Sequence, residues 1–135
     1  MIPCSANRVI KVDPKTETVT VIGDKDLLKS VDFKWLGVTT GADGCLYAAP
    51  WQATAVLKIN PENDEVTQFG DLGHIEKRGW VGLVRGYAGD DNYLYAIPWL
   101  ASQVLKIDIA KSEITLIGQE FEGDELWSGG VLGTD

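Results

Sequence analysis

The chain has 135 residues, of which 44% are hydrophobic, and its 12 lysine and arginine residues against 20 aspartate and glutamate residues give a net charge of -8. This size and apolar content predict one compact domain, and the acidic balance argues against nucleic acid and anionic membranes as partners. The sequence has no apolar run long enough to span a bilayer and no secretory signal, so we expect a cytoplasmic location by default.

The sequence repeats itself three times. The segment IPCSANRVIKVD at 2–13 recurs as APWQATAVLKIN at 49–60 and as IPWLASQVLKID at 97–108, with offsets of 47 and 48 residues. The segments that follow keep the register, because VTVIG, VTQFG and ITLIG end at Gly23, Gly70 and Gly118. A fixed period of this size indicates a repeat architecture in which each unit is one supersecondary structure.

Each unit predicts four short strands in a fixed order. The first strand begins at a tryptophan, in WLGV, WVGLV and WSGGV, and the second is an LYA segment that ends at a proline. The third is the V-(L/I)-K-(I/V)-D segment, and the fourth is the V-T-x-(I/F)-G segment. Glycine and aspartate turns join the first two strands, and Asp-Pro or Asn-Pro favours a type I turn before the fourth strand in two of the units.

A four-stranded antiparallel unit repeated every 40 to 50 residues or so is typical of a β-propeller blade. The sequence therefore predicts an all-β domain over residues 1–135, built as a β-propeller with three four-stranded blades. The expected blade repeats are at about 1–33, 34–78 and 79–125, and a further first strand is expected at 126–135.

The segment NRVIKVDPKTETVTVIG at 7–23 resembles the outer strands of the NHL, gluconolactonase-like and virginiamycin-lyase-like propellers. The resemblance covers the repeat and implies a propeller of a kind that often has six blades. It carries no catalytic residue over to this chain.

Three blades are too few to close a ring, because propellers typically have about four to eight. The chain starts late in a second strand and its last segment is a first strand, so its two ends are complementary. We expect a homodimer in which two copies form a six-bladed ring by blade complementation, although each chain lacks the connection between those two strands. The alternative is that the chain is part of a longer propeller protein.

Five tryptophans are predicted to gather at one end of the blades, because they begin first strands or follow second strands. Packing between blades is the simpler explanation for the tryptophans that begin first strands. Aromatic faces beside amide side chains otherwise suit a sugar or another flat, polar ligand. The candidate ligand-binding residues are Trp35, Trp51, Trp80, Trp99, Trp127, Asn7, Gln52 and Gln103.

The sequence has no catalytic motif that we can identify, since nucleophile, paired-histidine and phosphate-loop patterns do not occur. The only histidine, His74, lies beside Glu76 and the Lys77-Arg78 pair. The repeated lysines Lys11, Lys58 and Lys106 are expected to end in water. The two cysteines, Cys4 and Cys45, are expected to be free thiols.

We therefore expect a non-enzymatic binding or interaction module that needs no cofactor. The first alternative is a metal-dependent propeller hydrolase or lactonase with a divalent cation such as calcium. The carboxylates that could surround the cation are Asp32, Glu76, Asp124 and Glu125. The second alternative is a structural part of a larger propeller protein.

Overall fold

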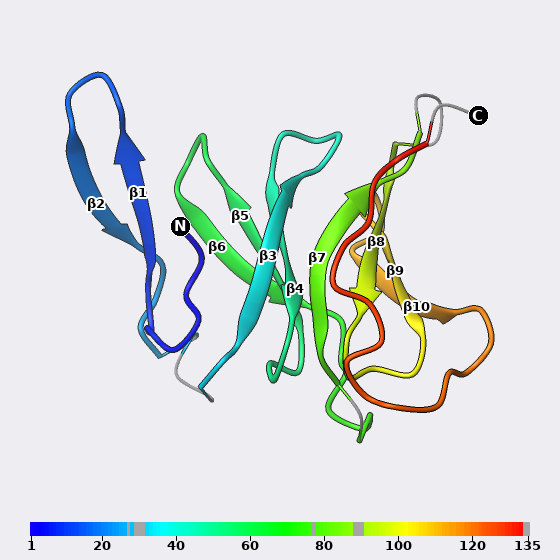
Figure 1. Cartoon of the computed structure of the whole chain (residues 1–135). Coiled ribbons are helices and arrows are strands. Elements are labelled where there is room, and N and C mark those ends of the chain that lie inside the picture. Colours follow the sequence, from blue (N-terminus) through cyan, green and yellow to red (C-terminus); the bar gives the residue numbers. More distant parts are fainter. Residues whose placement is uncertain (27, 29–31, 77, 88–90, 134–135) are drawn as a thin grey trace.

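The computed structural model describes residues 1–26, 28, 32–76, 78–87 and 91–133. Ten β-strands and no helix occur in this part of the chain. They form three antiparallel sheets, of two, four and four strands, which stand side by side (Figure 1). No described segment forms a helix of the length and hydropathy needed to cross a bilayer.

We call the three sheets blades 1, 2 and 3. Blade 1 consists of β1 (Val9–Asp13) and β2 (Thr18–Ile22). Blade 2 consists of β3 (Trp35–Thr40), β4 (Leu46–Pro50), β5 (Val56–Asn60) and β6 (Glu65–Phe69). Blade 3 consists of β7 (Trp80–Arg85), β8 (Tyr93–Pro98), β9 (Val104–Asp108) and β10 (Glu113–Ile117). In each sheet the strands pair with their sequence neighbours, which confirms the predicted all-β meander.

The turn between the third and fourth strands of each blade is closed by the side chain that the sequence pattern indicated. Asp13 accepts a hydrogen bond from the backbone N–H of Lys15 at 2.8 Å, and Asn60 accepts one from that of Glu62 at 2.9 Å. In blade 3, where the turn has no proline, Asp108 accepts a hydrogen bond from the N–H of Lys111, one residue further along, at 3.0 Å. The turn therefore depends on the Asx side chain more than on the proline.

The first strands of blades 2 and 3 pass close to each other at a pair of glycines. Gly37 in β3 and Gly82 in β7 both have positive φ, at 78° and 72°, and both lie at a bulge after the tryptophan. A Cβ on Gly37 would come within 2.4 Å of the Cα of Gly82. The close approach of β3 and β7 thus requires a residue without a side chain.

Each blade has a preceding face and a following face, named for the neighbouring blade that would cover it. Tyr47 and Val56 on the following face of blade 2 pack with Trp80, Leu94 and Leu105 on the preceding face of blade 3. All five are essentially inaccessible to solvent. This interface is the larger of the two apolar clusters in the described chain.

The second apolar cluster lies between blades 1 and 2. Val9 and Ile22 on the following face of blade 1 pack with Trp35, Leu57 and Ile59 of blade 2. The core is divided between neighbouring blades because side chains alternate along each strand.

Residues before β1 take the place of the end of a second strand. The amino group of Met1 donates a hydrogen bond to the carbonyl of Ile10, and the N–H of Ile10 donates to the carbonyl of Met1 at 3.1 Å. Ala48 and Leu57 are paired at the equivalent position of blade 2. Blade 1 thus has its third and fourth strands and only the end of a second one in the described chain.

The segment after β10 returns along blade 3. The N–H of Leu126 donates to the carbonyl of Trp99 at 2.9 Å. The N–H of Lys34, just before the first strand of blade 2, donates to the carbonyl of Cys4 in the same way at 2.8 Å. The segment then runs beside β7 and β8, in red in Figure 1, and a Cβ on Gly130 would touch β7 and β8 side chains. Residues 126–133 form no strand in this chain, and residues 134–135 of the expected strand lie outside the described residues.

Candidate ligand-binding face

The end of the sheets where first strands begin and second strands end carries the tryptophans, and we call it the tryptophan end. Trp35 pairs with Pro50 across β3 and β4, and Trp80 pairs with Pro98 across β7 and β8. Trp51 and Trp99, which follow those prolines, are therefore at the same end. The backbone N–H of Trp127 donates to the carbonyl of Pro98 at 3.2 Å, so the structure places all five tryptophans at this end.

Trp35 and Trp80 are part of the core. Their exposed fractions are 1% and 0%, and each indole N–H donates to a backbone carbonyl, that of Ala55 at 2.9 Å and that of Gln103 at 2.8 Å. Their ring faces are covered by the protein, as the core explanation predicts.

Trp51 and Trp99 lie next to each other on neighbouring blades. Their ring centroids are 6.1 Å apart and the ring planes meet at 55°. Both side chains are half-buried. The backbone N–H of Trp51 donates to the carbonyl of Lys34 at 2.8 Å, and that of Trp99 donates to Gly79 at 2.9 Å. These bonds fix both residues to the start of the first strand of their own blade.

The other candidates have different surroundings. Asn7 and Gln52 are exposed, whereas the side-chain amide of Gln103 donates to the carbonyl of Gly118 at 2.8 Å. Trp127 is 43% exposed and packs edge to face on Phe121, with ring centroids 4.6 Å apart. Its side chain lines a pocket on the following face of blade 3 together with Tyr95 and Ile97.

Two cationic residues at the tryptophan end were not among the sequence candidates. Lys34 is 2% exposed and donates from Nζ to the carbonyl of Ser5 at 3.1 Å. Arg78 donates from Nη1 to the carbonyl of Ile75 at 2.7 Å, and its buried Nε has no hydrogen-bond partner among the described residues. Their place just before the tryptophans of the first strands is the signal that could have identified them.

The three repeated lysines do not simply end in water, contrary to expectation. Lys58 forms an ion pair with Asp43 at 3.0 Å, and Lys11 pairs with Asp64 of the next blade. The Nζ of Lys106 is 3.6 Å from the centroid of the Tyr93 ring. The reason is that each lysine side chain can reach an acidic side chain or an aromatic ring. These partners do not occupy the same position in the three repeats, so the repeat pattern does not reveal them.

Asp43 organises a polar cluster at the edge of the interface between blades 2 and 3. Its carboxylate accepts hydrogen bonds from the Tyr47 hydroxyl at 2.8 Å, from Lys58 Nζ at 3.0 Å and from the N–H of Cys45 at 3.1 Å. Burial by itself would raise the pKa of Asp43, but the hydrogen bonds outweigh it and hold this pKa below its usual value.

The same cluster keeps its other members in their ordinary forms. Burial and the bond to Asp43 raise the pKa of Tyr47 to about 12. Hydrogen bonds to Tyr47 and Asp43 raise the pKa of Lys58, and burial with the nearby Asp43 raises that of the Cys45 thiol. At neutral pH Tyr47 and Cys45 are therefore protonated, so the cluster has the character of a structural bond between strands and not of an activated nucleophile.

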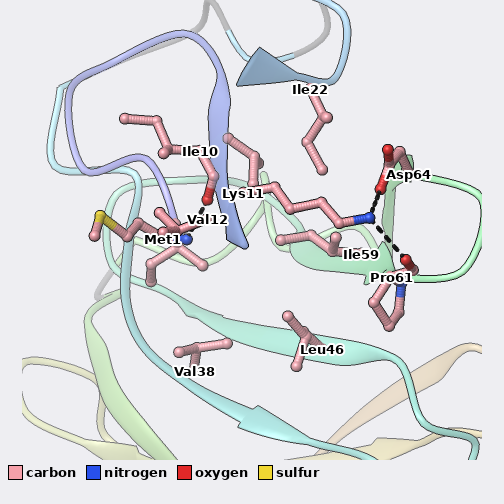
Figure 2. A pocket seen from close by; sticks show the side chains of 12 residues that line it. Met1, Ile10, Lys11, Val12, Ile22, Val38, Leu46, Ile59, Pro61 and Asp64 are labelled. Carbon is pink, nitrogen blue, oxygen red and sulfur yellow. Dashed lines mark hydrogen bonds and ion pairs between the residues drawn. The ribbon is translucent and has the colours of Figure 1, made fainter. Parts of the chain in front are cut away.

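An apolar cavity of about 240 Å³ lies between blades 1 and 2 (Figure 2). Val38, Leu46 and Ile59 of blade 2 line it, and the Lys11–Asp64 ion pair stands at its side. At the equivalent place between blades 2 and 3 the ring of Tyr47 is buried in the core. The cavity is thus the position of a second-strand side chain that the described part of blade 1 does not supply.

Metal ligands do not gather in the described part of the chain, where no group of three or more histidine, cysteine, aspartate or glutamate side chains is arranged around one point. The carboxylates considered for a cation, Asp32, Glu76, Asp124 and Glu125, are exposed. Cys4 and Cys45 are free thiols, as expected. Lys77, beside His74 in the sequence, lies outside the described residues.

No protein-family model and no curated protein matches this sequence. Its structure is similar to that of virginiamycin B lyase from Staphylococcus aureus, a six-bladed propeller, with a TM-score of 0.63 and 21% sequence identity over 84% of this chain. It is also similar to a catalytically inactive form of that lyase with quinupristin, with a TM-score of 0.57 and 15% identity over 82% of this chain.

The chain spans about a third of the length of these lyase structures, 35% and 33%. Identity at this level shows the fold alone. The predicted resemblance to virginiamycin-lyase-like propellers is thereby confirmed for the fold, and the described chain is a partial β-propeller with two complete blades and the outer strands of a third.

Proposed function

We propose that this propeller is a binding module for a flat, polar ligand such as a sugar ring, and that the ligand lies against Trp51 and Trp99. The observation that carries the proposal is the half-buried pair of indoles at the tryptophan end, 6.1 Å apart on neighbouring blades. Rings held by backbone hydrogen bonds are ready to stack without ordering a loop first, which favours binding.

Polar groups near the pair supply the hydrogen bonds that such a ligand needs. The side chain of Gln52 is exposed directly beside Trp51. Arg78 directly precedes Gly79, whose carbonyl accepts the N–H of Trp99, so this cationic residue belongs to the same end of blade 3. A lining that combines apolar rings with a few donors is the usual character of a small-molecule site.

Titration of tryptophan fluorescence with a panel of mono- and oligosaccharides tests this proposal. We expect saturable quenching by at least one sugar, and about fivefold weaker binding in Trp99→Ala, since stacking on one indole contributes roughly 1 kcal/mol. Tyr87→Ala is the matched control, because Tyr87 is an exposed aromatic residue after the far end of β7. A flat response of the unaltered chain across the panel would rule the proposal out.

A further inference from the structure

Blade 1 leaves uncovered a face that the other blades bury. Ile10 and Val12 are 37% and 43% exposed, whereas Leu57 and Ile59 at the equivalent positions of blade 2 are 0% and 4% exposed. Because side chains alternate along a strand, all of these residues lie on the preceding face of their blade.

The neighbouring strand extends this uncovered face. Val21 pairs with Ile10 and Val19 pairs with Val12, and these two valines are 50% and 64% exposed. Val66, the equivalent of Val19 in blade 2, is 8% exposed. Four branched apolar side chains thus form one patch, and patches of this kind normally mark an interface.

Blade 3 presents the matching surface at the other end of the stack. On its following face an open pocket of about 290 Å³ is lined by Tyr95, Ile97 and Trp127. Tyr47 and Ala49, the equivalents of Tyr95 and Ile97 in blade 2, are fully buried against blade 3. The preceding face of blade 1 and the following face of blade 3 therefore carry the same kinds of apolar side chains as the two sides of the interface between blades 2 and 3.

The segment that ends the described chain already lies where a first strand begins. Glu125 has φ 56°, as Phe33 has φ 53° at the same distance before its own tryptophan. Trp127 is nevertheless 43% exposed, whereas Trp35 is 1% exposed and donates its indole N–H to the carbonyl of Ala55. No third strand of the same blade stands beside Trp127 in the described chain.

We propose that the preceding face of blade 1 docks on the following face of blade 3 of a second copy of this chain. The segment at Trp127 of each copy then lies at the first-strand position of blade 1 of the other, next to the end of the second strand that residues 1–3 supply. Since the uncovered face of blade 1 and that of blade 3 are each used once, a two-fold axis closes two copies into one ring of six blades. The indole of Trp127 then faces the carbonyl of Arg8 of the partner subunit, the equivalent of Ala55.

Charge complementarity supports a second copy as the occupant. Lys11 of blade 1 pairs with Asp64 in the last turn of blade 2 (Figure 2). Lys106 has the same repeat position in blade 3 as Lys11 in blade 1, and Glu17 has the same position and the same left-handed φ as Asp64, 56° and 60°. If the second copy docks with the geometry seen between blades 1 and 2, Lys106 therefore lies against Glu17 of the partner subunit.

The first experiment measures the mass of the chain in solution by light scattering and by sedimentation over a range of concentrations. We expect twice the chain mass of 14.7 kDa. Val19→Asp should raise the dimer Kd at least about 100-fold, because it buries an unpaired carboxylate. Thr18→Asp is the control, since Thr18 is an exposed neighbour whose side chain points to the other face of β2.

The second experiment mixes two charge variants. Lys106→Glu and Glu17→Lys should each raise the dimer Kd about tenfold or more through like-charge contacts, while Lys15→Glu in the β1–β2 turn should not. A mixture of the first two variants should form a heterodimer with a Kd within about threefold of the original, because both of its interfaces then pair opposite charges.

Three results would overturn the inference: a monomer at all concentrations, a mass that rises without limit in place of a closed dimer, or charge variants that do not complement each other. These measurements use no ligand. Their outcome is therefore independent of the sugar titration.

Discussion

The interface between blades 2 and 3 and the interface between blades 1 and 2 use the same repeat positions but bury them to different extents. In the first, the ring of Tyr47 fills the space beside Leu94 and Leu105, and all three are 0% exposed. In the second, a cavity of about 240 Å³ occupies the place of that ring. The burial of a repeated residue is thus decided by its neighbouring blade and not by the residue itself.

The largest expected effect compares two positions of the same repeat. Leu105→Ala should lower the free energy of unfolding by about 2 to 5 kcal/mol, because Leu105 is fully buried. Ile10→Ala, at the equivalent position of blade 1, should lower it by less than about 1 kcal/mol in the isolated chain. Urea denaturation at a concentration where the chain is monomeric measures both, and equal losses would mean that the preceding face of blade 1 is covered.

The next effect concerns the close approach of β3 and β7. Gly37→Ala should cost about 2 to 3 kcal/mol, since its Cβ would overlap the backbone of Gly82 and its φ of 78° disfavours alanine. Gly44→Ala is the control, with a similar φ of 77° and open space around it, and should cost only about 1 kcal/mol. Similar losses in the two variants would show that strain in φ, and not contact between blades, makes glycine necessary.

A smaller effect separates the two ion pairs. Asp43→Asn should cost about 1 to 2 kcal/mol, because Asp43 accepts three hydrogen bonds in a partly buried cluster. Asp64→Asn should cost less than about 0.5 kcal/mol, because the Lys11–Asp64 pair is 43% and 41% exposed. The unfolding free energy of both variants, measured as a function of pH, distinguishes the Asp43 cluster from the exposed Lys11–Asp64 pair.

The sign of that dependence follows from the pKa directions. The lowered pKa of Asp43 stabilises the folded chain above about pH 4, and this contribution is lost as the pH falls through the folded-state pKa. The pKa of Tyr47, raised to about 12, contributes below about pH 10 and is lost as the pH rises towards 12. Asp43→Asn should reduce the acid-side loss without abolishing it, since backbone hydrogen bonds also lower the pKa values of Asp13 and Asp108, and an unchanged acid limb would contradict the assignment.

The repeat period and the alternation along each strand were sufficient to predict the strands, their order and the placement of Trp35 and Trp80 in the core. The period could not distinguish Trp127 from those two residues, because its exposure depends on a neighbouring strand and not on its own sequence. The pairing of Lys58 with Asp43 also escaped the prediction. It requires the turn after β3 to fold back over β5, which is a contact between segments and not a local pattern.

The Asx turns that join the third and fourth strands bear on the order in which this chain folds. Each turn closes a hairpin whose partners are near in sequence, such as Asp13 with Thr18, so the entropy lost in forming it is small. The contacts between β3 and β7 join segments about 45 residues apart and form more slowly. We therefore expect the outer hairpins to form first and to offer the template on which the inner strands, and then the stacked blades, assemble.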